Sequence, residues 1–435
     1  MNIFISILYE LVLLILALLY IPKLIYMFFK QKKYRTSFFY KLGMSVPTPQ
    51  KKQLPSIWIH AVSVGETHAI VSVARELKNL FPHHALIISS TTETGHREAK
   101  RCMPFADFHT FLPFDFKWCV YKAIKKTSPG LVILCESDFW FNFLNYSKKQ
   151  GAAIVLVNGK MSEKSMKNYR FFSFFSKKLF DLFDLLCVQN SLYAQRFIET
   201  GVNPDKIVTT GNLKLDVEHP KLTVDEINEW RQKLGITSNQ MVLTIGSSHD
   251  PEEKNLIEVI KKIWVQNPAL KVIIVPRHPE RFKIVAEFLE KERLNWIAFS
   301  DISRRTGQEQ VILMDAMGLL RMCYQLSNMA IVCGSFTNKV GGHNIIEPCW
   351  YGVPVLFGPH MFTQQELVNI MLHYDAGHQI EMDKVEEVIL KWIKNEEERK
   401  KIGENGLRLI QNLRGTTKRT LEAMKPFYST LKGSY

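Results

Sequence analysis

Short apolar runs of strand length alternate along this chain with stretches in which apolar residues recur every three or four positions. In the first half the runs occupy residues 56–59, 85–89, 131–135, 153–157 and 185–188. The helical spacing is clearest after the first run, at Ala69, Ile70, Val73, Ala74 and Leu77. Strands that alternate with helices in this way predict a parallel sheet covered by helices.

A second series of apolar runs follows, at residues 241–245, 271–275, 296–299, 311–314, 329–333 and 353–357. A chain of 435 residues exceeds what one core usually supports, and the periodicity fades around residues 217–223. We therefore predict an α/β fold of two doubly wound, Rossmann-like domains, residues 56–220 and 221–435, with the last helix packing back on the first domain. Ligands in such folds bind beyond the carboxyl ends of the strands, so we expect the active site in a cleft between the two sheets.

The amino-terminal segment has a different pattern. Residues 3–22 are almost continuously apolar, with Glu10 as the single charge, and this length is sufficient to cross a bilayer. Basic residues follow at Lys23, Lys30, Lys32, Lys33 and Arg35, and such flanks usually stay in the cytoplasm. We predict a membrane anchor over residues 1–30, a basic connector over residues 31–55 and a cytoplasmic remainder. The alternative is a helix buried in the core.

Composition narrows the class of partner and of chemistry. A net charge of +14 indicates an anionic partner, which can be nucleic acid, anionic lipid or a phosphorylated substrate. The seven cysteines form no C-x-x-C pair, which argues against a zinc site or a disulfide framework. The sequence contains no P-loop, no G-x-G-x-x-G motif and no D-x-D pair, so neither these nucleotide folds nor a metal-dependent mechanism is indicated.

One stretch of the second half, residues 334–360, combines turn-forming and polar residues between two apolar runs. The pair Gly341 and Gly342 allows the backbone to approach a ligand closely. Asn344 and Glu347, three residues apart, predict a helix that begins at Asn344 with a reciprocal cap. The free N–H groups of that helix start would bind an anion. The alternative is that the two residues only cap the helix.

Candidate catalytic residues of the first half lie at strand ends. Glu66 follows the first strand, and a carboxylate in a cleft can remove the proton of an attacking hydroxyl. Its alternative role is to favour the positive end of the following helix. Glu136 and Asp138 follow a buried strand, and Lys214, near the domain junction, can present a positive charge to a phosphate.

Strand ends of the second half carry residues suited to an anionic ligand. Arg277 and His278 form a natural pair for a phosphate or a sugar carboxylate. Gly318, after another strand, permits close backbone contact. Because these motifs follow strands on both sides of one junction, together they predict a single shared site.

Residues 160–180 mix Lys and Arg with aromatic residues, including four phenylalanines within residues 171–175. Such a mixture suits a membrane surface or an acidic amphiphile. A core-facing aromatic stripe with solvated lysines is equally consistent with it. Nucleic-acid stacking is the third option, and no recognised module supports it.

In combination, these motifs resemble the Kdo transferases, the 3-deoxy-D-manno-octulosonic acid transferases of glycosyltransferase family 30. The matching segments after the apolar amino terminus are HAVSVGE (60–66), CESDFWFN (135–142), TGNLKLD (210–216), VPRHPERF (275–282), DAMGLL (315–320), GGHNIIEP (341–348) and GPH (358–360). The resemblance covers essentially the whole chain. It implies a GT-B fold anchored at the cytoplasmic side of the cell inner membrane. It also implies transfer of Kdo from CMP-Kdo to a lipid A precursor, lipid IVA, in lipopolysaccharide assembly, with no nucleic acid partner.

The resemblance also assigns roles to residues. It implies that Glu66 is the general base and that Glu136 and Lys214 are supporting charged residues. The residues implied for CMP binding are Pro276, Arg277, Met317, Gly318, Leu319, Asn344, Ile345, Ile346 and Glu347. No metal and no cofactor are implied beyond the donor substrate CMP-Kdo. A helix start, Arg277 or Lys214 would stabilise the leaving phosphate, and Glu347 would accept hydrogen bonds from ribose hydroxyls.

Several positions depart from the family pattern. Leu319 stands where many members have Glu, so only its backbone is left to contact the nucleotide. Asp138 replaces a common Glu, and Phe141 a common Pro. Ser247, Ser248 and His249 match a serine–threonine–histidine stretch of the family, whereas Asp250, Pro251, Asn158, Gly159 and Lys160 do not follow the usual sequence. These changes concern the acceptor contacts and the number of Kdo residues added.

The sequence therefore predicts a membrane-anchored, metal-independent, inverting Kdo transferase. Two alternatives remain open. One is a GT-B transferase that uses a UDP-sugar on another lipid acceptor, and the other is a non-catalytic GT-B module that binds acidic lipid. Glu66 argues against the second, because a protein that only binds an anion has no need of a carboxylate facing it.

Overall fold

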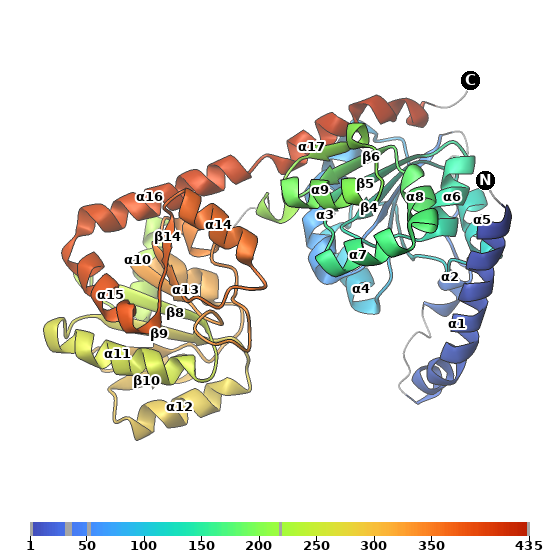
Figure 1. The fold of residues 1–435 in the computed structure, drawn as a ribbon. Coiled ribbons are helices and arrows are strands. Elements are labelled where there is room, and N and C mark those ends of the chain that lie inside the picture. The colour runs from blue at the N-terminus through green and yellow to red at the C-terminus, as the bar shows by residue number, and fades with distance from the viewer. Residues whose placement is uncertain (1–2, 31–36, 50–53, 217–219, 433–435) are drawn as a thin grey trace. The chain divides into compact units, whose positions relative to one another are not determined.

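The computed structural model describes residues 3–30, 37–49, 54–216 and 220–432. The chain forms two compact units: residues 1–217 together with 413–435, and residues 218–412. Each unit contains a parallel sheet with helices on both faces (Figure 1). The residues after 412 thus belong to the first unit and not to the second.

The sheet of the first unit has seven strands among the described residues, in the order β3-β2-β1-β4-β5-β6-β7, and all of its strand pairs are parallel. The strands are β1 (Ser56–His60), β2 (Leu86–Ser90), β3 (Phe108–Phe111), β4 (Pro129–Cys135), β5 (Ala153–Gly159), β6 (Leu185–Val188) and β7 (Ile207–Thr209). Side chains alternate between the faces, so that Ile57 and Ile59 lie in one buried cluster and Trp58 in the other. The strands predicted in this half are confirmed.

Helices cover both of these clusters. The α-helices of the first unit after the amino-terminal one are α2 (Phe38–Lys41), α3 (Val64–Leu80), α4 (Glu93–Cys102), α5 (Lys117–Thr127), α6 (Phe141–Lys149), α7 (Glu163–Phe171), α8 (Ser173–Asp181), α9 (Ser191–Glu199) and α17 (Thr416–Met424). Short 3₁₀ turns are η1 (Pro204–Lys206), η2 (Leu213–Leu215) and η6 (Lys425–Leu431). The apolar residues predicted from Ala69 to Leu77 form the buried face of α3.

The amino-terminal helix α1 (Ile3–Phe29) is held to this unit near its start. Tyr9 Oη donates to Asp115 Oδ2 at 2.7 Å. Glu10 Oε1 accepts from Asn142 Nδ2 at 2.6 Å and from the N–H of Lys117 at 3.1 Å. The single charge of the apolar segment therefore satisfies polar groups of the domain.

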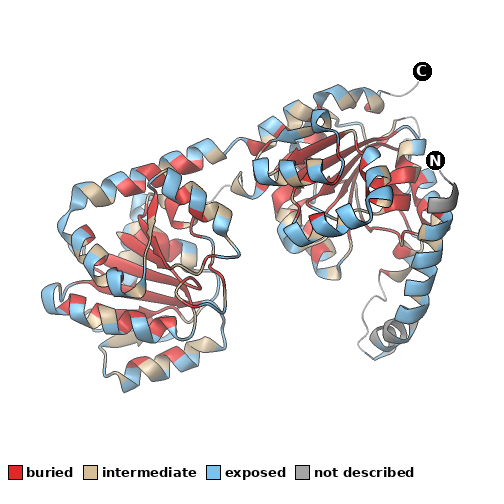
Figure 2. Cartoon of the chain, viewed as in Figure 1, coloured by how far each residue is buried: buried red, intermediate tan, exposed pale blue. Residues whose placement is uncertain are grey.

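Beyond this contact, the described apolar side chains of α1 are largely exposed (Figure 2), with Leu18 at 58% and Leu19 at 74%. This part of α1 is thus not a core helix. Among the residues described, no helix meets the length and hydropathy that a membrane crossing requires. The predicted basic residues Lys32, Lys33 and Arg35 lie outside the described residues.

The second unit repeats the architecture, with a parallel sheet in the order β10-β11-β9-β8-β12-β13-β14. Its strands are β8 (Val242–Ser248), β9 (Lys271–Pro276), β10 (Trp296–Ala298), β11 (Val311–Leu313), β12 (Met329–Val332), β13 (Val355–Phe357) and β14 (Gly377–Gln379). Its α-helices are α10 (Val224–Lys233), α11 (Glu252–Gln266), α12 (Arg281–Lys291), α13 (Leu320–Leu326), α14 (Gln365–His373), α15 (Val385–Lys394) and α16 (Glu396–Leu413). Its 3₁₀ turns are η3 (Phe299–Arg304), η4 (Pro348–Tyr351) and η5 (Met382–Lys384).

The carboxyl-terminal segment packs on the first sheet. Met424 and Leu431 join the buried cluster that contains Ile57 and Ile59. Asp216, just before the chain enters the second unit, accepts hydrogen bonds from the N–H groups of Gly415, Thr416 and Thr417 at the start of α17. A carboxylate at this position neutralises the positive end of the helix and satisfies its free donors.

Candidate active site

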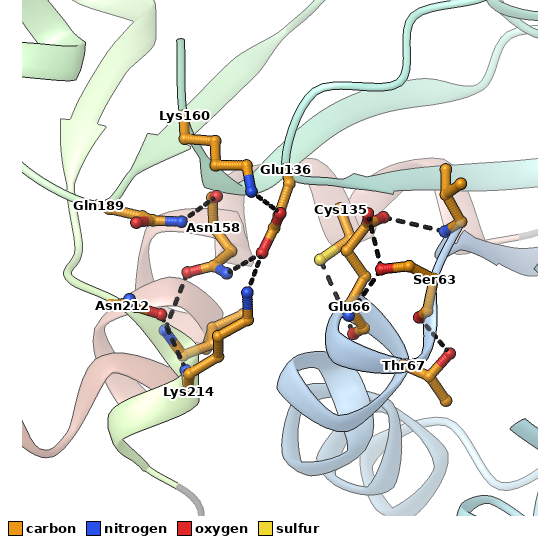
Figure 3. A network of polar contacts seen from close by, with 12 residues as sticks. Ser63, Glu66, Thr67, Cys135, Glu136, Asn158, Lys160, Gln189, Asn212 and Lys214 are labelled. Carbon is orange, nitrogen blue, oxygen red and sulfur yellow. Dashed lines mark hydrogen bonds and ion pairs between the residues drawn. The ribbon is translucent and has the colours of Figure 1, made fainter. Parts of the chain in front are cut away.

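A cluster of charged side chains lies at the carboxyl end of β4 (Figure 3). Glu136 directly follows this strand, and its side chain is 3% exposed. Lys214 Nζ donates to Glu136 Oε1 at 2.6 Å, and Lys160 Nζ forms an ion pair with Oε2. Burial raises the pKa of Glu136, but the bonds from the two lysines outweigh it and hold the pKa below its ordinary value. The structure thus brings the predicted pair Glu136 and Lys214 together and adds Lys160.

Asn158 in β5 organises this cluster from a fully buried position. Its Nδ2 donates to Glu136 Oε1 at 3.4 Å, and its Oδ1 accepts the N–H of Leu213 at 2.9 Å, which fixes the η2 turn that carries Lys214. Asn158 and Glu136 have positive φ angles of 54° and 68°. Such backbone strain collects at functional sites. Sequence reasoning missed Asn158 and Lys160 as site residues, although the Asn-Gly-Lys sequence at a strand end was a signal.

Glu66 lies in the first turn of α3. Its Oε2 accepts the N–H of Val62 at 2.9 Å, and its Oε1 accepts Ser63 Oγ–H at 3.2 Å. Ser63 Oγ in turn accepts the N–H of Glu66 at 3.4 Å. The alternative role considered for Glu66, stabilising the start of its helix, is therefore present in the structure.

The same carboxylate also belongs to the charged cluster (Figure 3). Burial raises the pKa of Glu66, the N–H of Val62 lowers it and the nearby Glu136 raises it further, which leaves it above the ordinary value. A raised pKa makes a carboxylate a stronger base, provided that it is still ionised at the working pH. Glu66 can therefore act both as a helix cap and as a proton acceptor.

In the second unit a cavity of about 400 Å³ lies beside the carboxyl ends of β8 and β9. Six of the residues predicted to bind CMP line it: Pro276, Arg277, Met317, Gly318, Asn344 and Glu347. They come from three segments that are far apart in the sequence. Gly318 has a φ of +86°, and the space beside its Cα is open, so a ligand can approach the backbone there.

Three other predicted residues do not line this cavity. Ile345 and Ile346 are fully buried, and Leu319 packs against the core on one face of the second sheet. Their side chains hold the loops in place. Any contact that these positions make with a nucleotide would have to use the backbone.

The helix predicted to begin at Asn344 is absent. Residues 345–347 form a turn, followed only by η4 (Pro348–Tyr351), which ends at Gly352 with a φ of 71°. Asn344 Oδ1 accepts the N–H of Ile346 at 3.2 Å, whereas Glu347 faces Arg321 and makes no reciprocal cap. Pro348 has no N–H for a helical hydrogen bond, and the left-handed Gly352 ends the turn, so an α-helix cannot extend here. The anion site expected at a helix start is therefore wrong.

The cavity also contains residues that the sequence did not assign. Arg321 Nη2 lies 3.5 Å from Glu347 Oε1. Burial raises the pKa of Glu347, although Arg321 opposes this rise. Ser247 has a φ of 56°, which is unusual outside glycine, and His343 completes the lining. The signal for His343 was its place directly between the glycine pair and Asn344.

Comparisons with known proteins agree with this arrangement. A family model described as 3-deoxy-D-manno-octulosonic-acid transferase (kdotransferase) matches residues 35–217. The 3-deoxy-D-manno-octulosonic acid transferase of Chlamydia trachomatis serovar D is 32% identical over 412 residues, which are 94% of this chain and 94% of that protein. The transferase of the same name from Chlamydophila psittaci is 30% identical and covers 98% of this chain and 97% of its own length.

The chain belongs to the Kdo transferase family. Among solved structures, a glycosyltransferase from Rickettsia africae superposes with a TM-score of 0.58 at 16% identity, over 87% of this chain and 100% of that one. At this identity the likeness concerns the fold, which is of the GT-B type.

One departure from the Kdo transferase pattern has a clear structural role. Asp138 Oδ2 accepts from Trp140 Nε1 at 2.8 Å and lies 3.1 Å from Nε2 of the buried His60. Burial raises the pKa of Asp138, but the contact with His60 outweighs it and the pKa falls below its ordinary value. The shorter Asp138 is thus engaged with His60 and Trp140, not with the lysines of the charged cluster.

The basic and aromatic stretch of this Kdo transferase divides between two of the expected roles. Phe171, Phe172 and Phe174, in and between α7 and α8, are 81%, 52% and 55% exposed. Phe175 instead stacks on the ring of Tyr9 in α1 at 5.6 Å between centroids. The stretch is therefore an exposed aromatic surface anchored on one side to α1, and not a core stripe alone.

A group of potential metal ligands forms among the described residues, although the sequence spacing indicated none. His68 of α3 and Glu98 and Cys102 of α4 place their donor atoms within 4.8 Å of one another. Glu98 already pairs with His68 Nε2 at 2.9 Å and with Arg101 Nη2 at 2.6 Å. These contacts account for the carboxylate as an ion-pair partner.

Proposed function

We propose that this protein transfers Kdo from CMP-Kdo to a lipid A precursor such as lipid IVA. The observation that carries the proposal is the cavity of the second unit, where Arg277, Gly318 and Glu347 come together from three separate segments. Membership of the Kdo transferase family supports the same reaction. In this assignment the second unit holds the donor nucleotide and the first unit supplies the acceptor site and the base.

The cavity has the polar groups that a nucleotide monophosphate requires. The exposed guanidinium of Arg277 can bind phosphate oxygens through two N–H groups. Glu347, held by Arg321, can accept hydrogen bonds from ribose hydroxyls. The open backbone at Gly318 lets the base or the ribose lie against the chain. These contacts involve side chains and backbone only, so the proposed reaction needs no metal ion.

The proposed chemistry is a single displacement with inversion at the anomeric carbon. Glu66 removes the proton of the acceptor hydroxyl while its oxygen attacks that carbon. The bond from the anomeric carbon to the phosphate oxygen breaks, and its electron pair leaves with CMP. Lys160 and Lys214, each less than half exposed, hold Glu136 ionised and keep positive charge where acidic substrates meet the first unit.

We also propose that α1 attaches the protein to the cytoplasmic side of the inner membrane. The exposed leucines of α1 and the exposed Phe171, Phe172 and Phe174 supply apolar surface on the first unit. The net charge of +14 favours an anionic bilayer and a phosphorylated acceptor. The charged Glu10, bonded to Asn142, orients the helix on the domain.

The reaction can be tested directly with purified protein, CMP-Kdo and lipid IVA, with mass spectrometry of the lipid product. We expect the lipid to gain the mass of one or more Kdo residues and unlabelled CMP to inhibit the transfer. The Glu66→Gln variant should give no product while it still binds CMP. Inhibition by UDP but not by CMP, with no transfer from CMP-Kdo, would support a transferase that uses a UDP-sugar instead.

A further inference from the structure

Two histidines lie directly against each other beside the proposed donor cavity. His343 lines the cavity, and its Nε2 is 2.7 Å from Nε2 of His249. The rings are nearly parallel, at 14° and 5.0 Å between centroids. Neither residue has a role in the function proposed above.

The backbone around the pair holds both rings in place. The N–H of His249 donates to Glu252 Oε2 at 3.1 Å, and the same buried carboxylate accepts the N–H groups of Gly334 at 2.8 Å and Phe336 at 2.9 Å. Gly334 has a φ of +72°, and a Cβ built there would lie 2.8 Å from Cδ2 of His343. A glycine at 334 thus leaves the space that the His343 ring occupies.

The contact between the two Nε2 atoms requires a shared proton. At 2.7 Å one nitrogen must donate and the other accept, because two unprotonated lone pairs would repel each other. The pair therefore already carries one proton on this contact. Each ring has its Nδ1 left, which can be protonated or bare.

The charged surroundings decide whether the pair gains a further proton. The groups that act on it are Arg277 and His278 after β9, Arg281 at the start of α12 and Glu252 of α11, with Glu347 and Arg321 also in the lining of the cavity. Burial lowers the pKa of both histidines, and that of His343 falls to about 4. In the unliganded protein the pair is therefore uncharged at neutral pH. An anion in the cavity would reverse this balance, because it stabilises a positive charge beside it.

We propose that the His249–His343 pair takes up one proton when the phosphate of the donor enters the cavity. This inference rests on the proposed function, since it places a phosphate there. His343 then donates a charge-assisted hydrogen bond to a phosphate oxygen, and His249 is the positioning residue that fixes the ring and shares the charge. As the bond to the anomeric carbon breaks, the electron pair moves onto the phosphate, and this positive charge stabilises it.

Proton uptake can be measured by calorimetry with the full chain in detergent. The probe is cytidine 5′-methylphosphate, a phosphodiester that has no ionisation of its own near neutral pH. Titrations in two buffers with different ionisation enthalpies, at the same neutral pH, give the number of protons taken up. For the wild type we expect between about half and one proton per bound probe. The affinity should also fall as the pH rises, by up to about tenfold per unit.

Three variants locate the proton. His343→Gln and His249→Gln keep an amide that can donate and accept, but they cannot hold the charge, so uptake and pH dependence should be lost while weaker binding persists. His278→Gln is the matched control, because it removes a neighbouring imidazole outside the pair, and it should keep the uptake.

The outcomes separate this inference from the proposed function. Binding by the wild type with no difference between buffers would overturn the inference and leave the donor site intact. Uptake that survives in His343→Gln and disappears in His278→Gln would assign the proton to His278 and overturn it as well. Absence of any binding by the wild type would overturn both the donor site and the inference.

Discussion

At the scale of single residues, Glu66 shows that a structural role and a chemical role need not compete. The carboxylate accepts from Val62 and Ser63 at the start of α3, and burial together with Glu136 raises its pKa. The capping contacts fix the orientation of the side chain. A base that is held in one orientation loses less entropy when it meets the acceptor hydroxyl.

The Glu66→Gln variant tests this role. The amide keeps the size of the side chain but cannot take a proton, so the rate of transfer should fall by roughly 10²–10⁴-fold. Binding of CMP, measured by calorimetry, should be unchanged. Glu76→Gln, on the exposed face of the same helix, serves as the control and should keep full activity. Unchanged turnover in Glu66→Gln would remove this residue from the base role.

The raised pKa of Glu66 predicts a pH dependence with a definite sign. The base must be ionised, and its folded pKa lies above the ordinary value of 4.5. Activity should therefore be lost as the pH falls through this raised pKa, with kcat/KM dropping about tenfold per unit below it. A pH profile whose acid limb begins at or below 4.5 would contradict the assignment.

The ion pairs of Glu136 predict a stability effect that a double variant can reveal. In Lys160→Met with Lys214→Met the buried Glu136 loses both cations, and the free energy of unfolding should fall by roughly 2–4 kcal/mol, discounted because the lysines are partly exposed. Because the folded pKa of Glu136 is lowered, this contribution is present above the unfolded pKa and is lost as the pH falls through the folded pKa.

The measurement is urea unfolding at neutral pH. Adding Glu136→Gln to the double variant removes the unpaired charge and should restore most of the lost stability. If the triple variant is no more stable than the double variant, the loss comes from the lysine side chains themselves and not from the charge.

At the scale of elements, the TGNLKLD segment has two functions that the sequence could not separate. Lys214 reaches Glu136, whereas Asp216, the last residue of the segment, binds the start of α17 about 200 residues later. Gly211 is needed for the same packing, because a Cβ there would lie 2.6 Å from Oγ1 of Thr416. The motif therefore joins the catalytic cluster to the returning carboxyl terminus.

The Asp216→Ala variant should weaken the packing of α17. Three N–H groups lose their acceptor, and the free energy of unfolding should fall by about 1–2 kcal/mol, as for other helix caps. Asp205→Ala, at an exposed position in η1, is the matched control and should cost less than about 0.5 kcal/mol. Equal urea midpoints for the two variants would contradict the capping role.

Strands that the apolar pattern failed to predict are β3, β7 and β14, and all three lie at sheet edges. Central strands are covered by helices on both faces and read as continuous apolar runs. An edge strand is partly exposed, as in β7, where Val208 and Thr209 face solvent, so its sequence lacks that signal. Short edge strands are recognised only when the neighbouring strand is already in place.

At the scale of the whole molecule, the exposed face of α1 predicts how the protein meets a membrane. In Ile15→Gln, Leu18→Gln and Leu19→Gln combined, the helix keeps its contacts through Tyr9 and Glu10 but loses apolar surface. Co-sedimentation with vesicles of phosphatidylglycerol and phosphatidylethanolamine should fall at least roughly tenfold.

The matched control for that variant places the same three changes at exposed apolar residues of the second unit, Val224, Val265 and Ile284. It should sediment with vesicles as the wild type does. Equal binding of both triple variants would show that α1 is not the membrane contact, and the exposed phenylalanines of α7 and α8 would then be the next segment to test.

The sequence by itself determined the class of fold, the order of the central strands along the chain and the family, because local periodicity and short motifs record which residues are buried. It also identified Glu66, Glu136, Lys214 and Arg277 as candidates, since each follows or adjoins a predictable strand end.

Only the tertiary structure decided which of these groups meet. Lys214 and Glu136 are 78 residues apart in sequence, and His249 and His343 are 94 apart, so their contacts depend on how the strands are ordered in each sheet. The failed helix at Asn344 has the same origin, because Pro348 and Gly352 override a cap spacing that is locally favourable. Patterns along a chain encode burial, whereas the pairing of charges depends on topology, which no local pattern contains.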